Sequence, residues 1–258
     1  MKKKKTDMLR KLSIYGFELA SGSHNFYALL EFDITNLRSI LRNSRIEGNG
    51  GSLFAFLLKA IGKCLEEYPV FNSMINLKNC TTFDEVDINV PIEVNHKGSL
   101  ENKQYIIRNI NIKSIKEITE EIEKAKKNEN EEVGYIFSKP IQHILNVMPK
   151  RIVLLLLKYI VKNHKRVKDI SGTIFVTSVT MFSNAPGYII PYIGGPQAVS
   201  FAIGSTVKKA IVIRDEIKIR EMINITAIFN HDIVNGAPAA RFINRLREYI
   251  EVKYNDII

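Results

Sequence analysis

The residues best placed to do chemistry lie in the segment Phe229–Phe242, which reads FNHDIVNGAPAARF. A strand-like run ends at His231, and a helix is expected after Gly236, whose missing Cβ suits a turn. A histidine at a strand end is accessible and rigidly held, and imidazole changes charge near neutral pH, which suits a general base. A lone histidine is also often purely structural, so this segment by itself allows both interpretations.

Several segments, in the same order along the chain, resemble the catalytic domain of 2-oxoacid dehydrogenase dihydrolipoamide acyltransferases. The histidine segment is similar to the HxxxDG signature that this family shares with chloramphenicol acetyltransferase. GTIFVTSVTMF resembles the family's TISNLGMFG strand, and PQAVSFAIGS resembles its PPQA…AVG segment. The earlier matching segments are LLEFDITNL, FAFLLKAIGKCLEEYPVFNSMI, VDINVPIEV and YIIRNINIKSIKEITEEI, and the match covers roughly residues 24–128 and 171–251.

The resemblance implies an acyltransferase that uses acyl-coenzyme A as a substrate. His231 would take a proton from a thiol, hydroxyl or amine acceptor, which attacks the thioester carbonyl directly, without an acyl-enzyme. The resulting oxyanion needs a hydrogen-bond donor, and the family places a Ser or Thr hydroxyl there. Thr177 matches that position best and Ser178 is its neighbour; their side chains point to opposite faces of a strand. Both hydroxyls could equally be ordinary strand residues.

One residue departs from the signature. Position 235 is Asn, where the signature usually has Asp. An amide keeps the hydrogen-bonding shape of the carboxylate but loses its charge. Because some dihydrolipoamide acetyltransferases also carry Asn there, Asn235 stays among the expected site residues, together with His231, Thr177 and Ser178.

The resemblance also implies assembly. Both families form trimers with active sites between subunits, so His231 of one chain is expected to face Thr177 of the next. The 54 positions between these residues do not decide this by themselves. The alternative to an enzyme is a trimeric scaffold that kept the fold and lost the reaction.

The elements that must position these residues mix strands and helices without strict alternation. This order predicts an α/β fold with a mixed sheet covered by helices, and the resemblance makes it a chloramphenicol acetyltransferase-like two-layer sandwich. A doubly wound dinucleotide fold is not expected, since GxGxxG and P-loop patterns are missing. Strands are predicted over 24–34, 85–94, 104–110, 172–179, 198–204, 208–214 and 216–229, and helices over 35–43, 52–68, 114–128 and 237–251.

The predicted organisation is a basic N-terminal segment, residues 1–23, followed by the catalytic domain, residues 24–258. Twenty-three residues are too few for a lipoyl domain, so a free-standing catalytic domain without a lipoyl group is expected. Residues 129–170 form a helical insertion, punctuated by Pro140 and Pro149. The insertion either covers the mouth of the active site and selects the acceptor, or packs on the surface through apolar residues such as those at 154–157.

The bulk composition is that of an ordinary globular protein with a net charge of +10. Such a surface attracts nucleic acid, anionic lipid or phosphorylated cofactors, but no nucleic-acid motif is present. The basic run Lys162–Lys168 is either a solvated face or a contact for the phosphates of coenzyme A. The N-terminus is not a signal peptide, and the apolar run Ile152–Val161 is too short to span a bilayer, so a cytoplasmic location is expected.

A metal site and a cysteine redox motif are not expected. The two cysteines, Cys64 and Cys80, form no CxxC pair, and Cys64 reads as a buried apolar residue. The remaining histidines show no metal-ligand spacing and are expected on the surface or in packing: His24, His96, His143 and His164.

Overall fold

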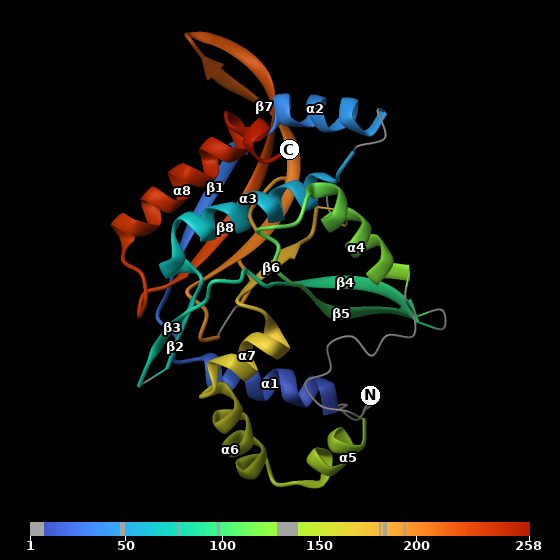
Figure 1. Cartoon of the computed structure of the whole chain (residues 1–258), viewed down its shortest axis with the longest axis vertical. Coiled ribbons are helices and arrows are strands. Elements are labelled where there is room, and N and C mark those ends of the chain that lie inside the picture. Colours follow the sequence, from blue (N-terminus) through green and yellow to red (C-terminus); the bar gives the residue numbers. More distant parts are fainter. Residues whose placement is uncertain are drawn as a thin grey trace, which may run out of the picture.

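A six-stranded mixed sheet runs through the computed structural model of the chain (Figure 1). The structure describes residues 8–46, 50–76, 78–96, 99–127, 139–180, 182, 185–192 and 195–258. The strand order is β1-β8-β7-β6-β4-β5; β6 is parallel to both of its neighbours, and the other pairs are antiparallel. The strands are β1 (Asn25–Asp33), β4 (Ile88–His96), β5 (Ser99–Ile107), β6 (Ile174–Ser178), β7 (Val199–Ile213) and β8 (Glu216–Asn230).

Helices cover one face of the sheet and enclose the main core. They are α2 (Thr35–Ile46), α3 (Leu53–Glu67), α4 (Ile115–Lys127) and α8 (Gly236–Glu251). Three phenylalanines join the layers, with ring centroids 4.4 Å apart for Phe71 and Phe242 and 5.8 Å apart for Phe71 and Phe229. The helix face of the sheet carries alternate residues such as Val176, Phe201 and Ile225. The predicted two-layer arrangement of a mixed sheet under helices is confirmed.

Two of the predicted helix starts follow from local hydrogen bonding. The Ser52 hydroxyl accepts from the Ala55 N–H and caps α3, as expected. Ser114 and Glu117 form a capping box at α4, since the Glu117 carboxylate accepts from the Ser114 N–H and the Ser114 hydroxyl accepts from the Glu117 N–H. Helix α3 ends just before Pro69, whose ring cannot continue a helix.

A second group of helices lies beside the sheet and has its own small core (Figure 1). It consists of α1 (Met8–Ala20), α5 (Lys139–Val147), α6 (Lys150–Val161) and α7 (His164–Ser171). Its core contains Leu145, Val153 and Leu157, against which pack Leu12, Tyr15, Leu19 and Met148. We call these four helices the helical unit. Part of the expected insertion, residues 129–138, lies outside the described residues.

The N-terminal segment contains a helix that was not predicted, since residues 8–20 form α1. Its stability comes from tertiary packing on α5 and α6, which short-range sequence patterns do not report. A second difference is that the two strands expected over 198–204 and 208–214 are one strand, β7, with a register shift between Ile203 and Thr206. A short hairpin, β2 (Ser73–Ile75) with β3 (Cys80–Thr82), was also not predicted.

Membrane-spanning helices and metal clusters are both missing from the described residues. Among them, no helix is both long and apolar enough to cross a membrane. The described part of the chain also contains no cluster of three or more His, Cys, Asp or Glu side chains arranged to hold a metal ion. Both cysteines are free, Cys64 buried and Cys80 exposed.

Candidate active site

His231 follows directly after the last residue of β8 and is exposed to solvent. Its backbone N–H donates to the His24 carbonyl at 2.8 Å, which fixes it beside the start of β1. Its ring lies edge-on to Phe26, with the centroids 5.2 Å apart. Neither ring nitrogen has a hydrogen-bond partner among the described residues. The imidazole is therefore held by packing, with both nitrogens available to a reactant.

The turn after His231 is closed by Asn230. The Asn230 carbonyl accepts from the N–H groups of Ile233 and Val234, and its side chain accepts from the Asp232 N–H at 3.0 Å. The Asp232 carboxylate points instead to His24, 2.9 Å from Nδ1, and both side chains are exposed. Asp232 therefore does not orient the His231 ring. The contact with His24 was not predicted, because it depends on the pairing of β1 with β8.

Asn235 occupies the N-cap position of α8, four residues after His231. Its backbone is extended, as N-cap residues usually are, yet its side chain makes no capping hydrogen bond. The residue is exposed. An N-cap amide that leaves the helix uncapped is free to bind a different group, which fits the site role expected for this position.

Thr177 and Ser178 lie at the end of β6 and point to opposite faces of the sheet, as expected. Val176 belongs to the core under the helices, so Thr177 projects from the other face, which we call the second face. The Ser178 hydroxyl lies 3.0 Å from that of Thr180, and the latter donates to the Gly204 carbonyl at 2.8 Å. Within the described residues the half-buried Thr177 hydroxyl has no hydrogen-bond partner.

The second face also carries polar side chains on the strands near Thr177. Thr177 is in register with Ala202 on β7, and Ala202 with Thr226 on β8. Thr226 is buried, and its hydroxyl has no partner among the described residues; the same holds for the side-chain oxygens of Asn224 and Asn89. Buried polar atoms ordinarily find partners in proteins. These three oxygens have almost no accessible surface, so in this structure only an enclosed water molecule can reach them, whereas Thr177 is partly exposed.

Thr177 and His231 of the same chain lie far apart. Thr226 is two strands away from Thr177, and His231 lies five residues beyond Thr226 along β8. With a rise of about 3.3 Å per residue and about 4.8 Å between strands, the two residues are roughly 20 Å apart. A site that uses both must take them from different chains.

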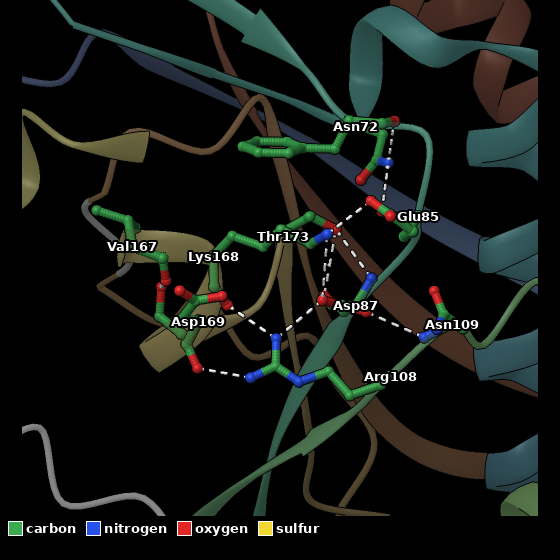
Figure 2. Close-up of polar contacts among 11 residues, drawn as sticks. Asn72, Glu85, Asp87, Arg108, Asn109, Val167, Lys168, Asp169 and Thr173 are labelled. Atoms are coloured by element: carbon green, nitrogen blue, oxygen red, sulfur yellow. Dashed lines mark hydrogen bonds and ion pairs between the residues drawn. The ribbon is translucent and has the colours of Figure 1, made fainter. Parts of the chain in front are cut away.

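A polar network fixes the start of β6 and therefore the position of Thr177 (Figure 2). The buried Asp87 carboxylate accepts from Arg108 at 2.8 Å and from the Asn109 N–H at 3.0 Å. Arg108 also donates to the carbonyls of Lys168 and Asp169 at the end of α7, and the Thr173 N–H donates to the Asp87 carbonyl. This network was not predicted, and its visible signal in the sequence is a pair of charged residues, Glu85 and Asp87, within the EVDINV strand pattern.

The residues of the basic run Lys162–Lys168, which was expected to meet solvent or phosphates, have different surroundings in the structure. Lys168 pairs with Glu85 at 2.6 Å and lies 3.8 Å from the Asp87 carboxylate, so it belongs to the network. His164 is buried between Asn76 and Thr81, which confirms a packing role. Burial lowers the pKa of His164.

Comparison with known proteins identifies the family. The model of the 2-oxoacid dehydrogenases acyltransferase (catalytic domain) matches residues 8–133 and 156–258. The lipoamide acyltransferase component of the branched-chain alpha-keto acid dehydrogenase complex from Bacillus subtilis is 26% identical over 232 residues, covering 87% of this chain and 46% of that protein. The acetyltransferase component of the pyruvate dehydrogenase complex from Rickettsia conorii is 24% identical over 238 residues, covering 88% and 48%. The chain thus spans about half the length of these relatives.

Solved structures share the fold. A probable dihydrolipoamide acetyltransferase from Listeria monocytogenes superposes with a TM-score of 0.71 at 22% identity, covering 100% of this chain and 99% of the other. Dihydrolipoamide acetyltransferase from Azotobacter vinelandii superposes with a TM-score of 0.75 at 16% identity, covering 100% and 94%. At these identities the likeness shows the fold, and the predicted fold class is confirmed. Since the family model matches most of its length, the chain belongs to the family of 2-oxoacid dehydrogenase acyltransferase catalytic domains.

Proposed function

We propose that this chain transfers an acyl group between coenzyme A and an acceptor, with His231 as the general base. The observation that carries the proposal is the placement of His231: exposed, held by Phe26 and by the His24 carbonyl, with both ring nitrogens unengaged among the described residues. A base in this position can accept a proton from a thiol, hydroxyl or amine that approaches from solvent.

The transfer is direct, from the thioester of acyl-coenzyme A to the acceptor. His231 takes the acceptor proton as the acceptor attacks the thioester carbonyl, and the protonated imidazole then returns that proton to the departing thiolate of coenzyme A. The negative charge on the carbonyl oxygen is stabilised by a hydroxyl donor. We assign this role to Thr177, whose hydroxyl has no other partner in the described part of the chain. Ser178 is the alternative.

A solved relative supports the choice of residue types. In dihydrolipoamide acetyltransferase from Azotobacter vinelandii, a serine, a histidine and an asparagine have been investigated for their role in the catalytic mechanism, and the asparagine lies four residues after the histidine. His231 and Asn235 have the same spacing. The serine of that enzyme has the residue type of Ser178, whereas the unengaged hydroxyl belongs to Thr177. The family signature has an Asp carboxylate at this position. We propose that the Asn235 amide takes its place and forms a hydrogen bond within the site.

The active site is proposed to lie between subunits of a trimer, or of a multiple of one. The distance of roughly 20 Å between Thr177 and His231 in one chain, derived from the sheet register, supports this arrangement. A structurally similar chain comes from the cubic core of a pyruvate dehydrogenase multienzyme complex.

The acceptor that the family favours is a dihydrolipoyl thiol, carried by another polypeptide or by a domain outside these residues. The proposed substrates are therefore acyl-coenzyme A and a thiol, with a hydroxyl or amine as the alternative acceptor. A cytoplasmic location remains part of the proposal.

The test is an acceptor screen with purified protein. Acetyl-, isobutyryl- and succinyl-coenzyme A are each incubated with dihydrolipoamide, a primary alcohol or a primary amine, and the acylated acceptor is measured by mass spectrometry. We expect acyl-dihydrolipoamide from the wild-type protein and none above background from His231→Ala. A correctly assembled wild-type protein that acylates none of these acceptors would favour the non-catalytic scaffold.

A further inference from the structure

The outer side of α6 carries apolar residues where a surface helix ordinarily carries polar ones. Helix α6 buries only Val153 and Leu157 against the helical unit. Exposed apolar residues recur on its other side at spacings of three and four, which places them in one stripe along the helix. Leu155 is 65% exposed and Tyr159 66% exposed. The stripe consists of Ile152, Leu155, Leu156 and Tyr159.

A row of cations runs along one edge of this stripe. Arg151, Lys158 and Lys162 are separated by seven and four residues, so they line up on the same flank of the helix. All three are exposed, and none pairs with a carboxylate among the described residues. Lys150, by contrast, lies toward α1 and pairs with Glu18 at 2.6 Å. We call the apolar stripe with its cationic row the outer α6 face.

The surrounding charge is strongly one-sided. Residues 139–170 contain eight Lys and Arg against one Asp, a net +7 within a chain of net +10. Lys2–Lys5 precede α1 in the sequence, and α1 packs against α6. Lys150 and Lys168 pair with carboxylates from other parts of the chain, whereas the other cations of this region whose side chains the structure describes form no ion pair with described residues. A binding partner complementary to the outer α6 face would therefore have an extended anionic surface that also accepts apolar side chains.

We propose that the outer α6 face binds the surface of an anionic lipid bilayer. Helices that lie in the plane of the headgroups have an apolar face that enters the acyl boundary and Lys or Arg side chains that reach the anionic headgroups. Twelve residues of helix extend about 18 Å, which is too short to cross a bilayer but ample for lying on it. Tyr159 suits the interface, because its ring is apolar and its hydroxyl is polar.

The first half of this face lies outside the pattern shared by the family. The family model leaves residues 134–155 unmatched, which include α5 and the first half of α6. The helical unit nevertheless connects to both sides of the candidate site. Helix α1 leads to His24, whose carbonyl holds His231, and α7 leads through Thr173 into β6 and Thr177. Lipid binding does not depend on the proposed acyl transfer and is tested without it.

The first experiment is co-sedimentation of the full chain with vesicles. Vesicles made of equal parts phosphatidylglycerol and phosphatidylcholine should bind the protein, and pure phosphatidylcholine vesicles should not. The triple variant Arg151→Gln, Lys158→Gln, Lys162→Gln should bind on the order of 100-fold more weakly, at about fivefold per cation removed. The matched control removes three exposed, unpaired lysines from α4, by Lys116→Gln, Lys124→Gln and Lys127→Gln, and should bind within about twofold of wild type.

The apolar stripe needs its own pair of variants. Leu155→Ser with Tyr159→Ser should weaken binding at least tenfold, whereas Ile112→Ser with Val252→Ser, which removes two exposed apolar side chains elsewhere, should leave it unchanged. Equal losses in the α4 and α6 charge variants would mean adsorption through overall charge and would overturn the proposal. So would a stripe variant that binds like wild type.

An optical measurement separates insertion from a contact between protein copies. The chain contains no tryptophan, so Tyr159→Trp creates a single reporter and Val252→Trp its control. On anionic vesicles the emission of the first should shift to shorter wavelength and be quenched by brominated lipid, and that of the second should not. If Tyr159→Trp responds only to protein concentration, with a change in mass by light scattering, the face binds another copy of the chain and the lipid proposal is wrong.

Discussion

The hydroxyl of Ser178 lies 3.0 Å from the hydroxyl of Thr180, and this contact determines which of the two strand-end hydroxyls is free. The Thr180 hydroxyl donates its one proton to the Gly204 carbonyl at 2.8 Å, so in the pair it must accept. Ser178 is therefore the donor and has used its proton. Thr177, on the second face, keeps its proton for another acceptor.

Thr177→Ala is expected to lower the rate of acyl transfer more than Ser178→Ala. Removing an oxyanion donor costs on the order of 10²–10³ in turnover number, whereas Ser178→Ala removes a contact within the strand end. Turnover numbers of both variants, with the acyl donor saturating, provide the measurement. A larger loss in Ser178→Ala would show that the Thr180 contact opens when the substrate binds, and the hydroxyl donor would then be Ser178.

His231→Ala is expected to lower acyl transfer by a factor on the order of 10²–10⁴ without unfolding the protein. The ring is exposed and contacts Phe26 at its edge, so its loss opens no cavity in the core. His24→Ala is the matched control, since it removes a neighbouring exposed imidazole but leaves the carbonyl that holds His231. Circular dichroism monitors the fold. Equal activity in the His231→Ala variant and the wild type would eliminate the general-base role.

Gly172→Ala is expected to destabilise the protein by about 1–3 kcal/mol. Gly172 ends α7 with φ of +67°, and an added Cβ would lie 2.6 Å from the Asp87 carbonyl oxygen. That oxygen accepts the N–H groups that start β6, so the strand cannot move away without breaking them. Gly16→Ala is the control: it lies within α1 with open space around it and should stabilise by about 0.5–1 kcal/mol. Urea unfolding midpoints measure both.

The sequence predicted those parts of the fold whose signals are local. The Ser52 cap, the Ser114 capping box and the strand that leads to His231 all depend on residues within a few positions of one another. Helix α1 and the continuity of β7 were missed, because each depends on residues far along the chain: α1 on Leu145 and Leu157, and β7 on pairing with β8.

The same distinction between local and long-range signals applies to the candidate site. The position of His231 followed from its motif, whereas its packing on Phe26 and the unengaged hydroxyl of Thr177 did not. Both come from contacts between strands that are distant in sequence. The Asp87–Arg108 pair spans 21 residues and meets the end of α7, so no local pattern could have revealed it.

The stability of the protein is expected to fall as pH decreases through about 6.5, because of His164. Asn76 donates its amide N–H to Nε2, and Nδ1 lies 2.7 Å from the Thr81 hydroxyl, so the folded ring binds as a neutral imidazole. Burial lowers its pKa in the folded state. As pH falls, His164 therefore takes up its proton first in the unfolded chain. The stability that is present above the pKa of His164 in the unfolded chain is lost below that pKa. His164→Gln should remove this part of the slope between about pH 7.5 and 5.5 in thermal unfolding; identical slopes would contradict it.

Mixing two inactive variants should restore activity if each site is built from two chains. His231→Ala chains keep Thr177, and Thr177→Ala chains keep His231. In trimers formed at random from equal amounts, an intact pair needs the intact histidine on one side of an interface and the intact threonine on the other. This occurs at about a quarter of the interfaces of a cyclic trimer. Denaturing the variants together and refolding them should therefore recover about a quarter of wild-type activity.

The controls for this experiment are each variant refolded alone, which should stay inactive, and the wild type refolded alone, which sets the scale. Light scattering establishes that the refolded mixtures have the mass of the original assembly. If correctly assembled mixtures recover no activity, both residues act within one chain. The β-sheet register places Thr177 and His231 roughly 20 Å apart. The strands would then have to move so that most of this distance closes. Recovery of activity, in contrast, requires that the end of β8 in one chain meets the end of β6 in its neighbour.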